Sequence, residues 1–320
     1  MVFKRKVYDK LLEWKKLSAG ASAVLLEGAR RIGKSTIVEE FAKNEYDDYM
    51  ILDFARENKD VRNNFIENMD DLDSFFRNLF LLKGKSLNGK NCVIIFDEVQ
   101  LFPYARQAIK YLVADGRYEY IETGSLISIR KNVKDILIPS EEYRIKMYPM
   151  DFEEYARANG VQESTIQYLK TCYETTSPVT EAVHETMCKL FFSYLVVGGM
   201  PDVVQTYVDT HDIAQVIARQ RDILALYRLD IAQYAQGNDK LKIRAIFDSI
   251  PAQLSEKNRR FILAALDPNG RQQRYADSFQ WLADAGVALP CYNVTEPQPP
   301  LRLNEKHNLF KLFQGDTGLL

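Results

Sequence analysis

The sequence predicts an α/β fold in which a doubly wound parallel sheet is followed by smaller, mostly helical regions. Two stretches indicate this fold. Residues 23–41 place a glycine-rich stretch between a short apolar run and an amphipathic segment. Residues 92–98 form an apolar run that ends in two acids. Strand-like runs then alternate with helical patterns as far as about residue 158, which is typical of βαβ units.

The glycine-rich stretch is Gly28-Ala-Arg-Arg-Ile-Gly-Lys-Ser35, a pattern typical of a phosphate-binding loop. Glycines allow tight turns that bring backbone N–H groups close to a polyphosphate. Lys34 adds a positive charge, Ser35 offers an oxygen ligand suited to Mg²⁺, and the following helix directs its N-terminus at the same anion. The alternative is a plain turn between a strand and a helix. The candidate nucleotide-binding residues are Gly28, Ala29, Arg30, Arg31, Ile32, Gly33, Lys34, Ser35 and Thr36.

The acidic run is Cys92-Val-Ile-Ile-Phe-Asp97-Glu98. Five apolar residues in a row predict a strand buried on both faces, as in a parallel sheet. Its acids then fall at the carboxyl end of the strand, where ligands bind in open α/β sheets. We expect Asp97 to hold the Mg²⁺ shell and Glu98 to polarise an attacking water. The alternative is a pair of acids at a helix N-terminus.

Other segments complete the predicted sheet. Residues 118–125 predict a strand that ends in Thr123-Gly-Ser125, and either hydroxyl is a candidate for sensing a terminal phosphate. A polar turn is the alternative for each. In the predicted helix 3–18, Tyr8 either touches a bound base or packs in the core, and core packing is favoured. The remaining predictions are strands at 49–54 and 144–149, helices at 57–88, 103–115 and 151–157, and core aromatics that include Phe65, Phe75 and Phe76.

The second half predicts a different organisation. Helices are expected over 162–174, 181–197, 202–208 and 211–235. A helix over 241–254, a strand over 260–266, a helix over 271–285 and two hairpin strands at 287–294 and 301–303 follow. This order is the outline of a winged helix, a module that either binds DNA or serves only for packing.

Composition excludes several classes of protein. The chain has 320 residues, 46% apolar and 27% charged, with a formal charge of −2, which is ordinary for a soluble chain of two or three domains. No global basic charge favours nucleic acid. Apolar runs are shorter than a membrane span, and no membrane partner is expected. Four scattered cysteines without a C-x-x-C argue against zinc and disulfides, so we expect a cytoplasmic protein.

Several segments together resemble a known family. They are the glycine-rich loop, Phe96-Asp-Glu-Val-Gln100, Thr123-Gly-Ser125, Gly198-Gly-Met-Pro201, Tyr227-Arg-Leu-Asp-Ile231 and Phe310-Lys-Leu-Phe-Gln-Gly-Asp-Thr-Gly-Leu-Leu320. Over nearly the whole chain they resemble the bacterial and archaeal AAA+-type ATP-binding proteins, which join an ATPase core to a winged helix. Members typically end in a restriction-endonuclease-like domain.

The resemblance implies roles for particular residues. The loop, Asp97 and Glu98 match the family's nucleotide-contacting positions, and its polar sensor falls on Thr123 to Ser125. The arginine that reaches into a neighbouring subunit's site falls on Arg144, with Arg130 as second choice and a lone surface arginine as the alternative.

Two departures from the family are visible. Asp202 stands where many members carry an arginine that contacts the γ-phosphate. The chain also stops at Leu320, where the family's last domain should begin, so a nuclease-like function is expected to be missing and residues 306–320 to be poorly packed.

The sequence therefore predicts an AAA+-like P-loop NTPase fold. Its expected domains are a core at 1–158, a helical lid at 159–238, a winged helix at 239–305 and the start of a truncated domain at 306–320. The expected function is Mg-dependent ATP binding and hydrolysis; the alternative is a nucleotide-gated switch or DNA-binding module with negligible turnover. The expected partners are ATP, further copies of the chain, and DNA through the winged helix. Catalytic candidates are Lys34, Glu98, Thr123, Ser125 and Arg144, and metal ligands are Ser35 and Asp97.

Overall fold

The computed structural model describes residues 2–18, 20–125, 140–235 and 239–320. Its packing divides the chain into two compact units, Met1–Tyr148 and Pro149–Leu320. Among the described residues, none of the helices combines the length and apolar character that a membrane span requires. The division into four domains at 158, 238 and 305 stays a prediction.

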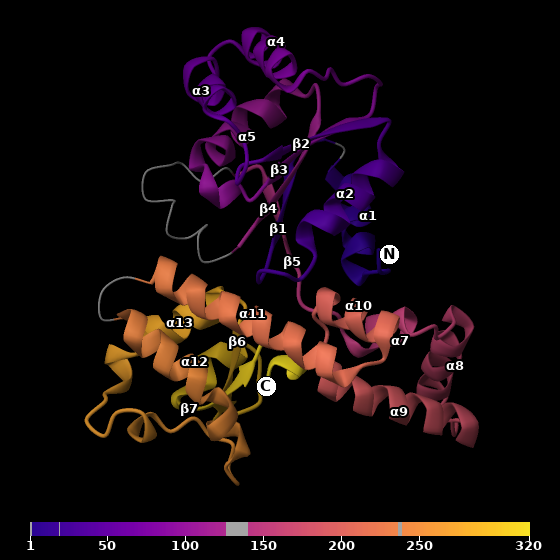
Figure 1. Ribbon diagram of the computed structural model, residues 1–320, viewed down its shortest axis with the longest axis vertical. Coiled ribbons are helices and arrows are strands. Elements are labelled where there is room, and N and C mark those ends of the chain that lie inside the picture. Colours follow the sequence, from indigo (N-terminus) through magenta and orange to yellow (C-terminus); the bar gives the residue numbers. More distant parts are fainter. Residues whose placement is uncertain (1, 19, 126–139, 236–238) are drawn as a thin grey trace. The chain divides into compact units, whose positions relative to one another are not determined.

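The first unit is a five-stranded sheet with helices on both faces (Figure 1). Its strands are β1 (Ala23–Glu27), β2 (Asp48–Asp53), β3 (Cys92–Asp97), β4 (Glu119–Gly124) and β5 (Glu142–Lys146). Its helices are α1 (Lys6–Ser18), α2 (Lys34–Glu45), α3 (Lys59–Glu67), α4 (Leu72–Lys83) and α5 (Pro103–Asp115), with the 3₁₀ turn η1 (Val99–Leu101) before α5. The predicted α/β fold is confirmed.

The strands lie in the order β2-β3-β4-β1-β5, and every neighbouring pair is parallel. All carboxyl ends therefore meet at one edge of the sheet. The loop after β1 and the acids after β3 flank the end of β4 at this edge, which is where open α/β sheets bind ligands.

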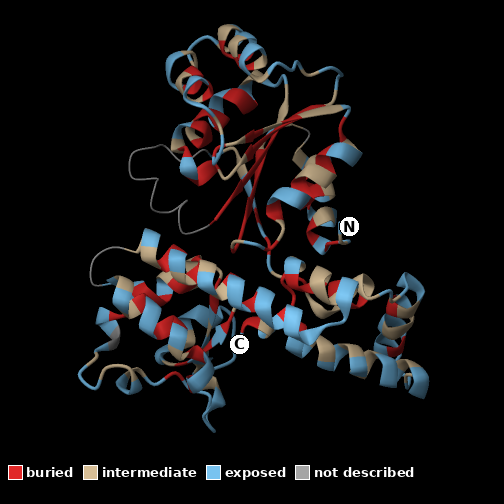
Figure 2. Ribbon diagram, in the orientation of Figure 1, coloured by how far each residue is buried: buried red, intermediate tan, exposed pale blue. Residues whose placement is uncertain are grey.

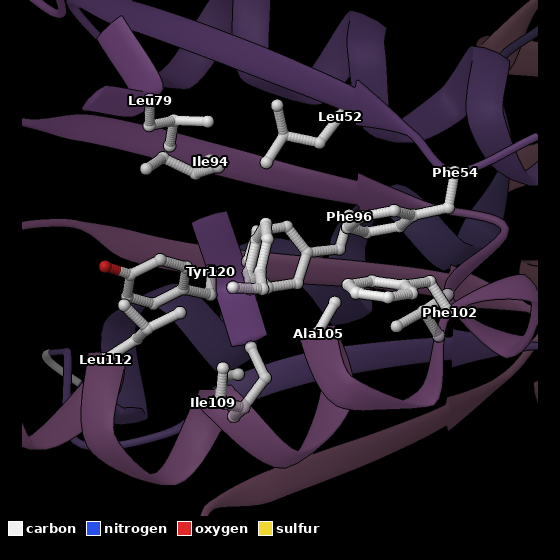
Figure 3. Close-up of a cluster of buried hydrophobic side chains, with 14 of the residues drawn as sticks. Leu52, Phe54, Leu79, Ile94, Phe96, Phe102, Ala105, Ile109, Leu112 and Tyr120 are labelled. Carbon is white, nitrogen blue, oxygen red and sulfur yellow. The ribbon is translucent and has the colours of Figure 1, made fainter. Parts of the chain in front are cut away.

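The main core of this unit lies between the sheet and helices α3 to α5. Figure 3 shows Phe54 and Phe96 from the strand side facing Phe102, whereas Ile109 and Leu112 of α5 approach Tyr120. Phe54 and Phe96 pack edge to face with centroids 5.7 Å apart, a favourable aromatic geometry. The predicted core aromatics Phe65, Phe75 and Phe76 are also buried here.

Strand β3 is buried on both faces, as its apolar run predicts. All residues from Cys92 to Phe96 are buried, and only Asp97 at its end is partly exposed (Figure 2). A strand of this kind has no room for polar groups in its body. Its acids are therefore confined to the edge of the sheet.

The second unit is mostly helical (Figure 1). Its helices are α7 (Phe152–Ala158), α8 (Glu163–Glu174), α9 (Glu181–Val197), α10 (Pro201–Thr210), α11 (Ile213–Tyr234), α12 (Asp239–Ser255) and α13 (Ala276–Asp284). Its two strands are β6 (Ala288–Val294) and β7 (Glu305–Gln314), and its 3₁₀ turns are η2 (Leu263–Ala265), η3 (Gln272–Arg274), η4 (Leu301–Asn304) and η5 (Thr317–Leu319). Asp151 and Glu154 form a capping box that starts α7, which fixes the entry into this unit.

The prediction of a strand over residues 260–266 is wrong. The N–H of Phe261 donates to the carbonyl of Phe310 in β7 at 3.0 Å, and the side chain of Arg260 donates to the carbonyl of Asn308 at 3.2 Å. The chain then turns into η2. The side chain of Gln253 donates to the carbonyl of Ile262 at 3.1 Å and accepts from its N–H at 3.0 Å. A side-chain amide thus takes the backbone bonds that a neighbouring strand would make.

The predicted hairpin is present, but its second strand begins later in the sequence than predicted. Residues 301–303 belong to η4, and β7 pairs antiparallel with β6 so that Leu289 faces Phe313. The prolines between the strands lengthen the connection. Residues 306–320 are therefore not poorly packed, because Leu312 and Leu319 are buried.

A close backbone contact joins Gly198 and Gly199 to the last residues of the chain. The buried Asp316 carboxylate accepts from the N–H of Gly199 at 2.6 Å and from that of Gly318 at 3.0 Å. Burial raises the pKa of Asp316 to about 6, and the two N–H donors oppose this shift. A Cβ on Gly199 would lie 2.0 Å from the carbonyl oxygen of Met150. This junction leaves no space for side chains.

We expect Gly199→Ala to lower the free energy of unfolding by about 3 kcal/mol or more, because backbone atoms cannot move away from the added methyl group. Gly160→Ala is the matched control. Gly160 has a φ of +88° and nothing within 4 Å of its Cβ position, so it should lose only about 1 kcal/mol from backbone strain. Urea unfolding measures both values, and equal losses would contradict the close contact.

Candidate nucleotide-binding site

The loop between β1 and α2 is shaped by two left-handed residues and one crowded glycine. Gly33 has a φ of 89° and Arg31 a φ of 67°. A Cβ on Gly28 would lie 2.4 Å from the carbonyl oxygen of Met147, so this position requires glycine. Gly33 provides no side-chain cap for α2. The N-terminus of α2 and the loop backbone are therefore suited to an anion.

Lys34 lies beneath the loop. Its buried ammonium donates to the carbonyl oxygens of Gly28 at 3.1 Å and Ala29 at 2.7 Å. Burial lowers the pKa of Lys34 to about 8, and the carboxylates of Glu98 and Asp97 partly oppose this shift. The loop thus holds a cation close to both acids of β3.

Asp97 connects three elements at the edge of the sheet. Its Oδ1 accepts from the hydroxyl of Ser35 at 2.8 Å and from the hydroxyl of Thr123. The Thr123 oxygen also accepts from the backbone N–H of Glu98 at 3.3 Å. The first turn of α2, the end of β3 and the end of β4 are therefore fixed around one carboxylate.

This donor set fits Mg²⁺. A Ser hydroxyl and a carboxylate are hard oxygen ligands, and Mg²⁺ in proteins usually takes one or two such ligands together with phosphates and water. Ser35 and Asp97 could hold the ion in this way. Within the described ranges no group of three or more His, Cys, Asp or Glu side chains is placed to hold a metal ion alone.

Glu98 follows in an uncommon backbone conformation, with a φ of 54° and a ψ of 43°. Its carbonyl oxygen accepts from the N–H of Leu101 at 2.9 Å and so begins η1. Its carboxylate accepts from the buried amide of Gln100. The sequence gives no role to Gln100, since a polar residue two positions after an acid has no distinctive spacing.

Comparison with known proteins agrees with this geometry. Residues 21–156 match the family described as an AAA domain. This segment is similar to an AAA domain, and it has the α/β P-loop fold. Residues 188–320 match a family described as a domain of unknown function, DUF8612. No curated protein sequence matches the chain.

Among solved structures, the Walker-type ATPase Paby2304 of Pyrococcus abyssi is similar, with 14% identity, a TM-score of 0.54, and coverage of 99% of this chain and 95% of that chain. The RuvB Holliday junction branch migration motor of Thermotoga maritima is 12% identical, with a TM-score of 0.36 and coverage of 90% and 89%. The first of these likenesses supports the P-loop fold.

The segment just before α1 contacts the loop between β1 and α2. The buried Arg5 donates to the carbonyl oxygens of Ile32 at 3.0 Å and Tyr148 at 2.7 Å. Tyr8 donates to Glu45 at 2.7 Å and packs edge to face on Phe41, which is the favoured core-packing role. The role of Arg5 could not be predicted from the sequence, because nothing there indicates the partner of one basic residue in a basic segment.

The remaining candidate catalytic residues are Ser125, Arg144 and Arg130. Ser125 is buried just beyond β4, but the hydroxyl that contacts Asp97 is that of Thr123. Arg144 lies on the edge strand β5, half exposed, with its guanidinium 3.4 Å from Glu142. Arg130 lies outside the described residues.

A buried charged cluster lies beside the site, on the face of the sheet that α5 covers. Arg106 of α5 donates to both oxygens of Glu142, at 2.6 and 2.7 Å. Glu122 of β4 is fully buried, and neither of its oxygens has a hydrogen-bond partner among the described residues. Burial raises the pKa of Glu122 well above its usual range, and the Glu142 carboxylate adds to this shift. Folding therefore favours the protonated form of the Glu122 carboxyl.

The raised pKa of Glu122 should make the stability of the chain depend on pH. Glu122 binds its proton more tightly in the folded chain than in the unfolded chain, so folding takes up a proton above the unfolded pKa of about 4.3. The contribution of Glu122 to the free energy of unfolding therefore falls as pH rises, by up to about 1.4 kcal/mol per pH unit. We expect Glu122→Gln to flatten the decline in unfolding free energy between pH 5 and 8.

Urea unfolding at several pH values measures this effect. Glu185→Gln removes an exposed carboxylate on α9 and is the control for the loss of one negative charge. Identical slopes for Glu122→Gln and the wild type would contradict the raised pKa of Glu122.

Proposed function

We propose that the chain binds ATP with Mg²⁺ at the loop after β1 and hydrolyses it. The observation that carries this proposal is the contact of Asp97 with both Ser35 and Thr123, beside Lys34 and Glu98. It brings together the residue types that phosphoryl transfer requires: a cation and backbone N–H groups for the phosphates, oxygen ligands for the metal, and a carboxylate for water.

In this proposal, each residue has a separate task. Lys34 and the loop N–H groups bind the β- and γ-phosphates, and Ser35 and Asp97 hold Mg²⁺, which when bound supplies positive charge to the phosphate oxygens. Glu98 accepts a proton from water as the water oxygen bonds to the γ-phosphorus. The bond from that phosphorus to the bridging oxygen breaks, and ADP leaves with the bonding electrons.

The arginine of the proposed site comes from another copy of the chain. Arg144 is the candidate, because it is half exposed on an edge strand and its contact with Glu142 is long. An arginine supplied in trans stabilises charge that develops in the transition state. Turnover would then rise with protein concentration.

DNA binding is the weaker proposal. Lys306, His307 and Lys311 are exposed on β7, and basic side chains contact phosphates in nucleic-acid complexes. Helix α13, which would face DNA in a winged helix, exposes Asp277 and Gln280 instead. Its acid would repel the phosphates.

Two substitutions test hydrolysis. We expect Lys34→Ala to abolish MgATP binding, because the loop then lacks its buried ammonium. We expect Glu98→Gln to retain binding and lower kcat about 100-fold or more, because an amide cannot accept the proton. Phosphate release and binding of a fluorescent ATP analogue measure the two effects. A wild-type rate equal to that of Glu98→Gln at every protein concentration would contradict the proposal.

A second pair of substitutions separates the two sensor candidates. Thr123→Val keeps the side-chain shape but removes the hydroxyl that contacts Asp97 and the N–H of Glu98. We expect kcat to fall at least about 10-fold, since buried polar groups then lose a partner. Ser125→Ala should lower kcat less. Steady-state ATPase assays decide between them, and a larger loss for Ser125→Ala would show that Ser125 is the sensor.

A further inference from the structure

We propose that Gln100 is the positioning residue for Glu98, and that it sets the direction in which the Glu98 carboxylate meets the attacking water. This inference rests on the proposed ATP hydrolysis. It assigns a role to a residue two positions beyond the acid pair, within η1.

The backbone around Glu98 is fixed on both sides. Its N–H donates to Thr123 at 3.3 Å, and its carbonyl oxygen accepts from Leu101 at 2.9 Å. Val99 in the same turn is fully buried. Glu98 is one of the few non-glycine residues with a positive φ, a conformation that costs of order 1 kcal/mol or more and that these contacts maintain. Only the side chain of Glu98 is left to be oriented.

Gln100 provides that orientation. Its side chain is 4% exposed, and its Nε2 donates to Oε2 of Glu98. With one carboxylate oxygen held, the other oxygen, Oε1, has a defined direction. Hydrogen bonds to a charged acceptor are stronger than neutral ones, and a base oriented by a third group is a recurring arrangement in catalysis. A primary amide neither gains nor loses a proton near neutral pH, so Gln100 orients the base and does not take part in proton transfer.

The test compares Gln100→Met and Gln100→Glu with the wild type. Methionine has a similar length and no N–H donor, whereas glutamate keeps the shape and places a second carboxylate against Glu98. We expect kcat to fall about 10- to 100-fold, with the larger loss for Gln100→Glu. The KM for MgATP should stay within about twofold, because Lys34 and Ser35 are untouched. A packing role would not give this separation of kcat from KM.

Two controls sharpen the test. Val99→Ala creates a small cavity in the same turn without changing the amide, so it should destabilise the chain while kcat changes less than about threefold. In a Glu98→Gln background, Gln100→Met should add less than about a twofold loss of kcat, since two residues that act as a unit are not additive.

The outcomes are distinct. Three results would each overturn the positioning role while ATP hydrolysis stands. They are a Gln100→Met kcat within twofold of the wild type, an equal loss of kcat for Val99→Ala, and a full additional loss of kcat in the Glu98→Gln background. A wild-type rate no higher than that of Glu98→Gln would overturn the proposed function and the role of Gln100 with it.

Discussion

The two hydrogen bonds that the Asp97 carboxylate accepts are the interaction on which the site depends. One oxygen accepts from Ser35 of α2 and from Thr123 at the end of β4. A carboxylate among packed strands is stable only when such donors replace water. The same bonds place the first turn of α2, and with it the phosphate-binding loop, against the ends of β3 and β4. Folding of the sheet therefore also creates the geometry that a bound nucleotide would need.

The register of the sheet is what brings Thr123 to Asp97. Phe96 pairs with Glu122, so the residues that follow each of them are neighbours at the carboxyl edge. A shift of β4 by one residue would turn every side chain to the opposite face and would carry the Thr123 hydroxyl away from Asp97. The apolar side chains of β3 and β4 exclude that shift, because Ile94, Phe96 and Tyr120 fit only the core under α5. Hydrophobic packing therefore sets the position of a polar site.

The same dependence explains what could be predicted from the sequence. The loop, the buried strand and its acids could be predicted, because glycine conformation, lysine charge and an apolar run act over a few neighbouring residues. The choice between Thr123 and Ser125 could not, since it depends on pairing between β3 and β4. Gln100 and Arg5 were missed because their partners appear only on folding. The strand predicted at 260–266 fails for a related reason: the distant side chain of Gln253 takes the bonds of Ile262.

The second unit shows that a distinctive sequence segment can reflect packing alone. Gly198 and Gly199 lack side chains because backbone atoms of Met150 and Gly318 and the Asp316 carboxylate occupy the space. Asp316 is buried, and its pKa is raised to about 6. Yet its two oxygens are taken up by the N–H groups of Gly199 and Gly318, which hold the chain's last turn against the end of α9. An acid so engaged orders the backbone, whereas Asp97 accepts from side-chain hydroxyls at the carboxyl edge of the sheet, where open α/β sheets bind ligands. The partners of a buried carboxylate, more than its burial or its pKa, distinguish a structural role from a chemical one.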